Sequence, residues 1–261
     1  MAGLVFIDGN MEDKPGTRFD LSCAPVLKGE SCRYVSRGGL KLEKALDEFN
    51  IDLEGALAID VGSSTGGFTD CMLQRGALSV YSVDVGYGQL AWKLRTDPRV
   101  VSMERTNARY LKTEDFPEGF DFATIDVSFI SLKKILPALA PLMKKKAVAV
   151  ALIKPQFEAG REKVGKRGVI KSMETHTEVL TDILDASNKI GFDVKGLTYS
   201  PVKGPNGNIE FLVCLQSTDG SEAFNGHPVK IFSNALSAVD PLMFGRLAAE
   251  VASEAHAGLD K

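Results

Sequence analysis

The residues with the clearest chemical meaning lie in the stretch AIDVGSSTGGFT, residues 58–69, where an apolar run ends in an acid. Glycines at the exit of a buried strand let the backbone approach a ligand closely and turn sharply into a helix. A dinucleotide-binding enzyme would show G-x-G-x-x-G here, but Ser64 stands where the second glycine belongs. The stretch therefore favours a ligand without a pyrophosphate.

S-Adenosylmethionine fits this pattern. Its ammonium would lie near Asp60 and its carboxylate near backbone N–H groups, while Asp84, at the end of the next apolar run, would accept hydrogen bonds from its ribose diol. The alternative is that the glycines only form a tight turn between a strand and a helix. The interval between Asp60 and Asp84 favours the cofactor site over that alternative.

Strand-like and helix-like stretches alternate around these residues, which predicts an α/β fold with a doubly wound, mostly parallel sheet. In such sheets ligands bind at the carboxyl ends of the strands, where the topology switches. The last stretch contains two strands around a Gly-Pro-Asn-Gly turn, and it predicts a terminal antiparallel hairpin. The predicted strands are 57–62, 78–86, 99–107, a run from 120 ending near Asp126, and one from 147; the predicted helices are 66–76, 132–146 and 172–192, and the hairpin is 193–216.

Composition favours one large domain with a small appendage. The chain has 261 residues, 44% of them hydrophobic, and a formal net charge of -3, which neither indicates nor excludes binding of nucleic acid. Four scattered cysteines without a CxxC predict reduced thiols, and three histidines show no metal-ligand spacing, so no metal is predicted. No apolar run approaches the ~20 residues that span a membrane. We expect a soluble, cytoplasmic protein.

Seven motifs occur in order along the chain and together carry a resemblance. The sequence resembles the TlyA (hemolysin A) family of FtsJ-like ribosomal RNA 2′-O-methyltransferases, from about Ala2 to about Gln216. The resemblance implies a Rossmann-like domain that uses S-adenosylmethionine to methylate ribose hydroxyls of ribosomal RNA. The motifs are YVSRGGLKLEKAL, AIDVGSSTGGFTDCMLQRGA, YSVDVGYGQLAWKLRTDPRV, ERTNAR, DVSFISL, LIKPQFEAGREKVGKRGV and GNIEFL.

The resemblance also implies site residues. The family's catalytic Lys-Asp-Lys-Glu tetrad falls on Lys41, Asp126, Lys154 and Glu210. The cofactor residues indicated by pattern and resemblance together are Asp60, Gly62, Ser63, Thr65, Gly66, Gly67, Phe68, Asp84 and Asn107.

Each tetrad residue also has a purely structural interpretation. Lys154 ends an apolar run, where a charged lysine is costly to bury, although its amine could instead extend to solvent. Without the resemblance Lys41 could not be preferred to Lys44, since both belong to an amphipathic helix. Asp126 could cap the next helix, and Glu210 could be a strand residue that faces water.

Lys154 is the predicted general base. A ribose 2′-hydroxyl is a poor nucleophile at neutral pH, so a neighbouring base must take its proton as the methyl group arrives. A lysine amine is neutral enough to do so after desolvation or beside another cation, here Lys41. Asp126 and Glu210 are expected to orient the lysine and to position the ribose.

The predicted RNA-binding residues are Arg37, Lys166 and Arg167. The last two lie in a glycine-flanked basic loop, residues 165–168, that could contact phosphates or could be an ordinary surface loop. The run 144–146 is three lysines, which we interpret as the positively charged end of a helix.

Three segments are predicted. Residues 1–30 resemble the remnant of an RNA-binding module whose helices would precede Ala2, so the chain is either truncated or naturally short; a β-hairpin packed on the main domain is the alternative. Residues 31–217 form the methyltransferase domain. Residues 218–261 form a helical C-terminal extension, either a dimer contact or a lid.

Two other functions are alternatives to RNA methylation. One is a membrane-damaging hemolysin, which would need an apolar or amphipathic element free to enter lipid, and no such element is evident. The other is a non-catalytic relative that binds RNA or cofactor only, which the complete tetrad argues against. The expected partner is ribosomal RNA or a ribosomal subunit. The sequence does not determine the oligomeric state.

Overall fold

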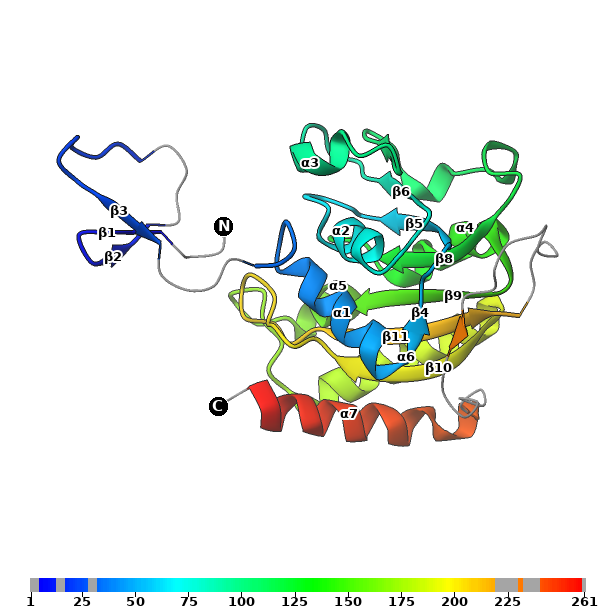
Figure 1. The fold of residues 1–261 in the computed structure, drawn as a ribbon. Coiled ribbons are helices and arrows are strands. Elements are labelled where there is room, and N and C mark those ends of the chain that lie inside the picture. Colours follow the sequence, from blue (N-terminus) through cyan, green and yellow to red (C-terminus); the bar gives the residue numbers. More distant parts are fainter. Residues whose placement is uncertain (1–4, 13–16, 28–31, 219–229, 232–239, 260–261) are drawn as a thin grey trace.

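A seven-stranded sheet occupies the centre of the computed structural model, which describes residues 5–12, 17–27, 32–218, 230–231 and 240–259 (Figure 1). Its strand order is β10-β11-β9-β8-β5-β6-β7. The strands are β5 (Leu57–Val61), β6 (Ser79–Val83), β7 (Val100–Met103), β8 (Phe120–Ile125), β9 (Met143–Ile153), β10 (Phe192–Tyr199) and β11 (Phe211–Ser217).

The direction of the strands creates a crevice beside β5. This strand pairs in parallel with β6 on one side and with β8 on the other, so the chain order reverses there. Such a reversal separates the loops at the carboxyl ends of the two neighbouring strands and leaves room for a ligand. Strand β11 runs antiparallel to both β9 and β10. The predicted parallel sheet with a terminal antiparallel hairpin is confirmed, although the loop of the hairpin extends over residues 200–210.

Helices cover both faces of the sheet, because its central strands are apolar on both sides. Ala58 packs in one cluster with α1 and α2, whereas the next residue, Ile59, packs in another cluster with α4, α6 and α7. The helices are α1 (Gly38–Glu48), α2 (Gly67–Gln74), α3 (Trp92–Arg95), α4 (Leu136–Leu139), α5 (Pro155–Glu158), α6 (Met173–Ile190) and α7 (Phe244–Leu259). The 3₁₀ turns are η1 (Ala108–Tyr110), η2 (Thr113–Asp115), η3 (Leu132–Lys134), η4 (Ala140–Leu142), η5 (Arg161–Lys163) and η6 (Pro241–Met243).

The prediction of one helix over residues 132–146 was wrong for the second half of that stretch. Two prolines divide the stretch into η3, α4 and η4, and the lysines 144–146 lie in strand β9 instead of at a helix end. Lys144 is buried and its Nζ donates to Asp121 Oδ1 at 2.8 Å, so this lysine completes an internal ion pair.

The two ends of the chain lie differently. Near the N-terminus, β1 (Val5–Ile7), β2 (Asn10–Met11) and β3 (Pro25–Leu27) form a small antiparallel sheet to one side of the main body (Figure 1). Residues 13–16 lie outside the described residues. Near the C-terminus, α7 packs its apolar face into the core beside α6, and β12 (Lys230–Ile231) pairs with β4 (Ile51–Asp52).

Candidate active site

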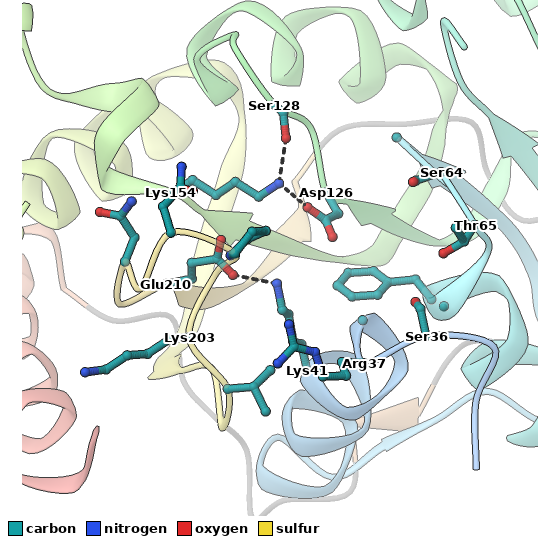
Figure 2. Close-up of a pocket in the computed structure, with 18 of the residues that line it drawn as sticks. Ser36, Arg37, Lys41, Ser64, Thr65, Asp126, Ser128, Lys154, Lys203 and Glu210 are labelled. Atoms are coloured by element: carbon teal, nitrogen blue, oxygen red, sulfur yellow. Dashed lines mark hydrogen bonds and ion pairs between the residues drawn. The ribbon is translucent and has the colours of Figure 1, made fainter. Parts of the chain in front are cut away.

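A cleft of about 1020 Å³ opens at the carboxyl ends of β5, β8 and β9 (Figure 2). Segment 35–38 and the start of α1 form one wall, and the loop before β11 forms another. The four tetrad residues predicted from the resemblance all line this cleft. They come from α1, from the ends of β8 and β9, and from the residue just before β11, so the sheet topology brings together positions far apart in sequence.

The four residues form two ion pairs. Lys41 Nζ donates to Glu210 Oε2 at 2.5 Å, and Lys154 Nζ lies 2.6 Å from Asp126 Oδ1 (Figure 2). The charge of Lys41, expected to act on Lys154, is therefore balanced within its own pair. Glu210 does not face water, since its side chain is 1% exposed.

The Lys154 amine has a second polar neighbour. Its Nζ donates a hydrogen bond to Ser128 Oγ at 3.0 Å. The backbone N–H of Asp126 donates to Val61 O at 2.9 Å, which fixes the start of this loop against β5. The amine is therefore held by two oxygens from one loop, and its side chain is 11% exposed.

The glycine-containing loop 62–67 lies beside these pairs, and its sequence is explained by backbone conformation. Gly62 has φ +85°, and a Cβ there would lie 2.4 Å from the carbonyl oxygen of Asp126. Gly66, with φ +93°, is the N-cap residue of α2 and has no side chain to cap that helix. The predicted residues Ser63, Thr65, Gly67 and Phe68 line the cleft. Free N–H groups at a helix start suit a carboxylate.

A second pocket of about 220 Å³ adjoins the cleft, and the two share Gly62 and Ser128. The predicted residues Asp84 and Asn107 line it. Asp84 Oδ2 accepts a hydrogen bond from Ser64 N at 2.8 Å, and Oδ1 accepts one from Gly86 N at 2.7 Å. Each carboxylate oxygen retains a lone pair for a further donor.

Asp60 lies elsewhere than predicted. Its side chain is fully buried, where Oδ2 accepts from Thr69 Oγ1 at 2.6 Å and Oδ1 accepts from Thr124 Oγ1 at 2.8 Å. It lines neither pocket, so the structure does not support direct contact with a ligand ammonium. Through these two hydrogen bonds the carboxylate of Asp60 instead connects strand β5 with helix α2 and strand β8.

We expect Asp60 to make stability depend on pH. Burial raises its pKa from 3.8 to about 6, against the opposing effect of the two threonine hydroxyls. Because the folded-state pKa is the higher one, this contribution to stability is complete below about pH 4 and is lost as pH rises through about 6. In the wild type this loss lowers the free energy of unfolding by up to about 3 kcal/mol, and the variant Asp60→Asn should not show it. Urea unfolding between pH 4 and 7.5 measures it, and equal pH slopes for the variant and the wild type would contradict the assignment.

The predicted RNA-binding residues flank the cleft. Arg37 lines it directly. Lys166 and Arg167 are exposed between Val164 and Gly168, both of which line the cleft.

Two residues of the cleft, Ser128 and Phe129, were not predicted from the sequence, although both belong to the motif DVSFISL. Phe129 is 90% exposed and lines the cleft with φ +63°. Both residues closely follow the predicted Asp126 in the sequence, and this proximity could have identified them as site residues.

Comparisons with known proteins agree with this geometry. Residues 34–217 match the FtsJ-like methyltransferase family. A Bacillus subtilis protein named "Putative rRNA methyltransferase YqxC" is 56% identical over 216 residues, which are 82% of this chain and 77% of that one. The Mycobacterium tuberculosis 16S/23S rRNA (cytidine-2′-O)-methyltransferase TlyA is 43% identical over 217 residues, 83% of this chain and 81% of that one. A solved structure, "Putative hemolysin from Streptococcus thermophilus", is 48% identical with a TM-score of 0.80, covering 99% of this chain and 88% of that one.

Proposed function

The chain belongs to the FtsJ-like methyltransferase family, and on that premise we propose that it methylates ribose 2′-hydroxyls of ribosomal RNA with S-adenosylmethionine. The observation that carries the proposal is the junction of two cavities beside two Lys–carboxylate pairs. Residues of both cavities suit a cofactor, the larger cleft is also open to a larger substrate, and the Lys154 amine lies in that cleft beside Ser128, which lines both cavities.

Residues of both cavities suit S-adenosylmethionine. The start of α2 offers N–H groups to its carboxylate, and Asp84 offers carboxylate oxygens to its ribose diol. Asn107, which lines the smaller pocket, would contact the adenosine half. When bound, the cofactor supplies an electrophilic methyl group on a sulfonium.

The tetrad suits proton removal from the substrate. As the 2′-oxygen takes the methyl group, Lys154 would accept the hydroxyl proton, for which its amine must be neutral. Asp126 holds that amine, and the pair of Lys41 and Glu210 positions the ribose from the opposite wall. Alignment of the reacting atoms by these groups supplies the remaining acceleration.

The outer part of the cleft suits RNA. The exposed ring of Phe129 offers a stacking surface for an unpaired base, and Arg37 with the basic loop 165–168 offers cations for phosphates. Ribosomal RNA as substrate implies a cytoplasmic location, and within the described residues no helix is both long and apolar enough to cross a membrane.

The test of the function is transfer of a labelled methyl group from S-adenosylmethionine to unmodified ribosomal subunits, with mapping of the modified nucleotide. We expect one or a few ribose 2′-O-methyl groups. Absence of transfer together with leakage of dye from liposomes would instead support the hemolysin alternative.

Cofactor binding gives a separate prediction. We expect Asp84→Ala to weaken the affinity for S-adenosylmethionine about thirtyfold, since it removes a charged acceptor of the ribose and of the Ser64 amide. Titration calorimetry measures this, with Asp97→Ala as the control because Asp97 pairs with Arg99 away from both pockets. Unchanged affinity in Asp84→Ala, or tighter binding of NADH than of S-adenosylmethionine, would contradict the assignment.

A further inference from the structure

Ser128 is a polar group of the cleft that the chemistry above does not use. It lies two residues after Asp126, lines both cavities and accepts a hydrogen bond from Lys154 Nζ at 3.0 Å. We propose that Ser128 is a positioning residue that, together with Asp126, aims the Lys154 amine at the substrate hydroxyl. This inference rests on the proposed function.

The number of acceptors around the amine supports this role. A neutral lysine amine has two N–H bonds and one lone pair, and it accepts a proton only through the lone pair. Ser128 Oγ takes one N–H from Nζ at 3.0 Å, and Asp126 Oδ1 forms an ion pair with the same Nζ at 2.6 Å (Figure 2). The lone pair is then left for the cleft. With Asp126 alone, the amine could rotate about its terminal C–N bond and the lone pair would have no fixed direction.

The loop that carries Ser128 is fixed to the segment that carries Lys154. Phe129 adopts φ +63°, a conformation that non-glycine residues take only where their surroundings impose it. Its ring packs on Phe157 with centroids 4.9 Å apart. Glu158 Oε1 accepts a hydrogen bond from Leu132 N at 2.8 Å. These two contacts, which follow Ser128 in the chain, hold its hydroxyl at a constant position relative to the lysine.

The first test is Ser128→Ala, measured as methyl transfer to unmodified ribosomal subunits. We expect kcat to fall about tenfold, the loss of one hydrogen bond to the reacting amine, with KM for the subunit and affinity for S-adenosylmethionine unchanged. Ser128→Thr keeps the hydroxyl and should restore most of kcat. Ser79→Ala is the matched control, because Ser79 Oγ donates to Arg99 O at 2.9 Å and Ser79 lines neither cavity. An alanine variant with wild-type kcat, or a threonine variant as slow as alanine, would overturn the proposal.

A double variant separates positioning from loop stability. If Ser128 acts through Lys154, removing it should cost nothing further once Lys154→Ala has been made, when both are compared in single turnovers. An additional tenfold loss in the double variant would show a structural role and overturn the inference. The two hypotheses fail differently: if the wild-type protein transfers no methyl group, the proposed function fails, whereas wild-type transfer with an active Ser128→Ala refutes only the role of Ser128.

Discussion

Lys154→Arg should lose nearly all methyl transfer, a fall of at least about a hundredfold, while the affinity for S-adenosylmethionine changes less than about twofold. Arginine keeps the positive charge and a donor for Asp126, but its guanidinium cannot give up a proton at working pH. A role in charge balance would survive this substitution, whereas a role as general base would not. Lys154 lines the cleft beside Ser128 and makes no contact with the smaller pocket, which is why cofactor binding should persist.

Labelled transfer to ribosomal subunits and calorimetry with the cofactor measure the two quantities. Lys133→Arg is a suitable control, because Lys133 pairs with Asp182 on an exposed surface. If Lys154→Arg turns over at near the wild-type rate, Lys154 is not the base, and proton removal has to be reassigned to another group of the cleft.

The sheet and the position of the site could be predicted from the sequence, because both follow from local patterns. Apolar runs that end in polar residues identify β5, β8 and β9, and the carboxyl ends of parallel strands meet at one edge. The tetrad could be listed from ordered motifs. The pairing within it could not, since Lys41 and Glu210 are 169 residues apart and only the packing of α1 against the end of β11 brings them together.

The incorrect predictions have physical causes too. Asp60 carries the sequence signature of a ligand-binding acid, but the alternation of side chains along β5 turns it beneath α2, where hydroxyls of Thr69 and Thr124 satisfy it. Lys144 follows an amphipathic pattern typical of a helix end. The buried carboxylate of Asp121 stabilises it inside a strand instead, and no local pattern reveals that partner.

Glu210→Gln should lower the free energy of unfolding by about 3 kcal/mol, the second large effect that we expect. The substitution leaves the Lys41 ammonium, whose side chain is 11% exposed, without its counter-ion. Breaking a buried pair by removing one partner is costly because the remaining charge has neither water nor an opposite charge nearby. Urea unfolding measures the change. Asp182→Asn, which breaks the exposed pair with Lys133, is the control and should change stability by less than about 1 kcal/mol.

The double variant Lys41→Met with Glu210→Gln distinguishes stability from catalysis. Removing the ammonium as well should recover most of the lost stability, because no uncompensated charge is left in the protein interior. Methyl transfer should stay at least about tenfold below the wild type, since the pair is proposed to position the ribose and a methionine cannot replace its hydrogen bonds. Recovery of stability and activity together would mean that the pair only supports the fold. Recovery of neither would mean that the loop before β11 depends on Glu210 through contacts other than its charge.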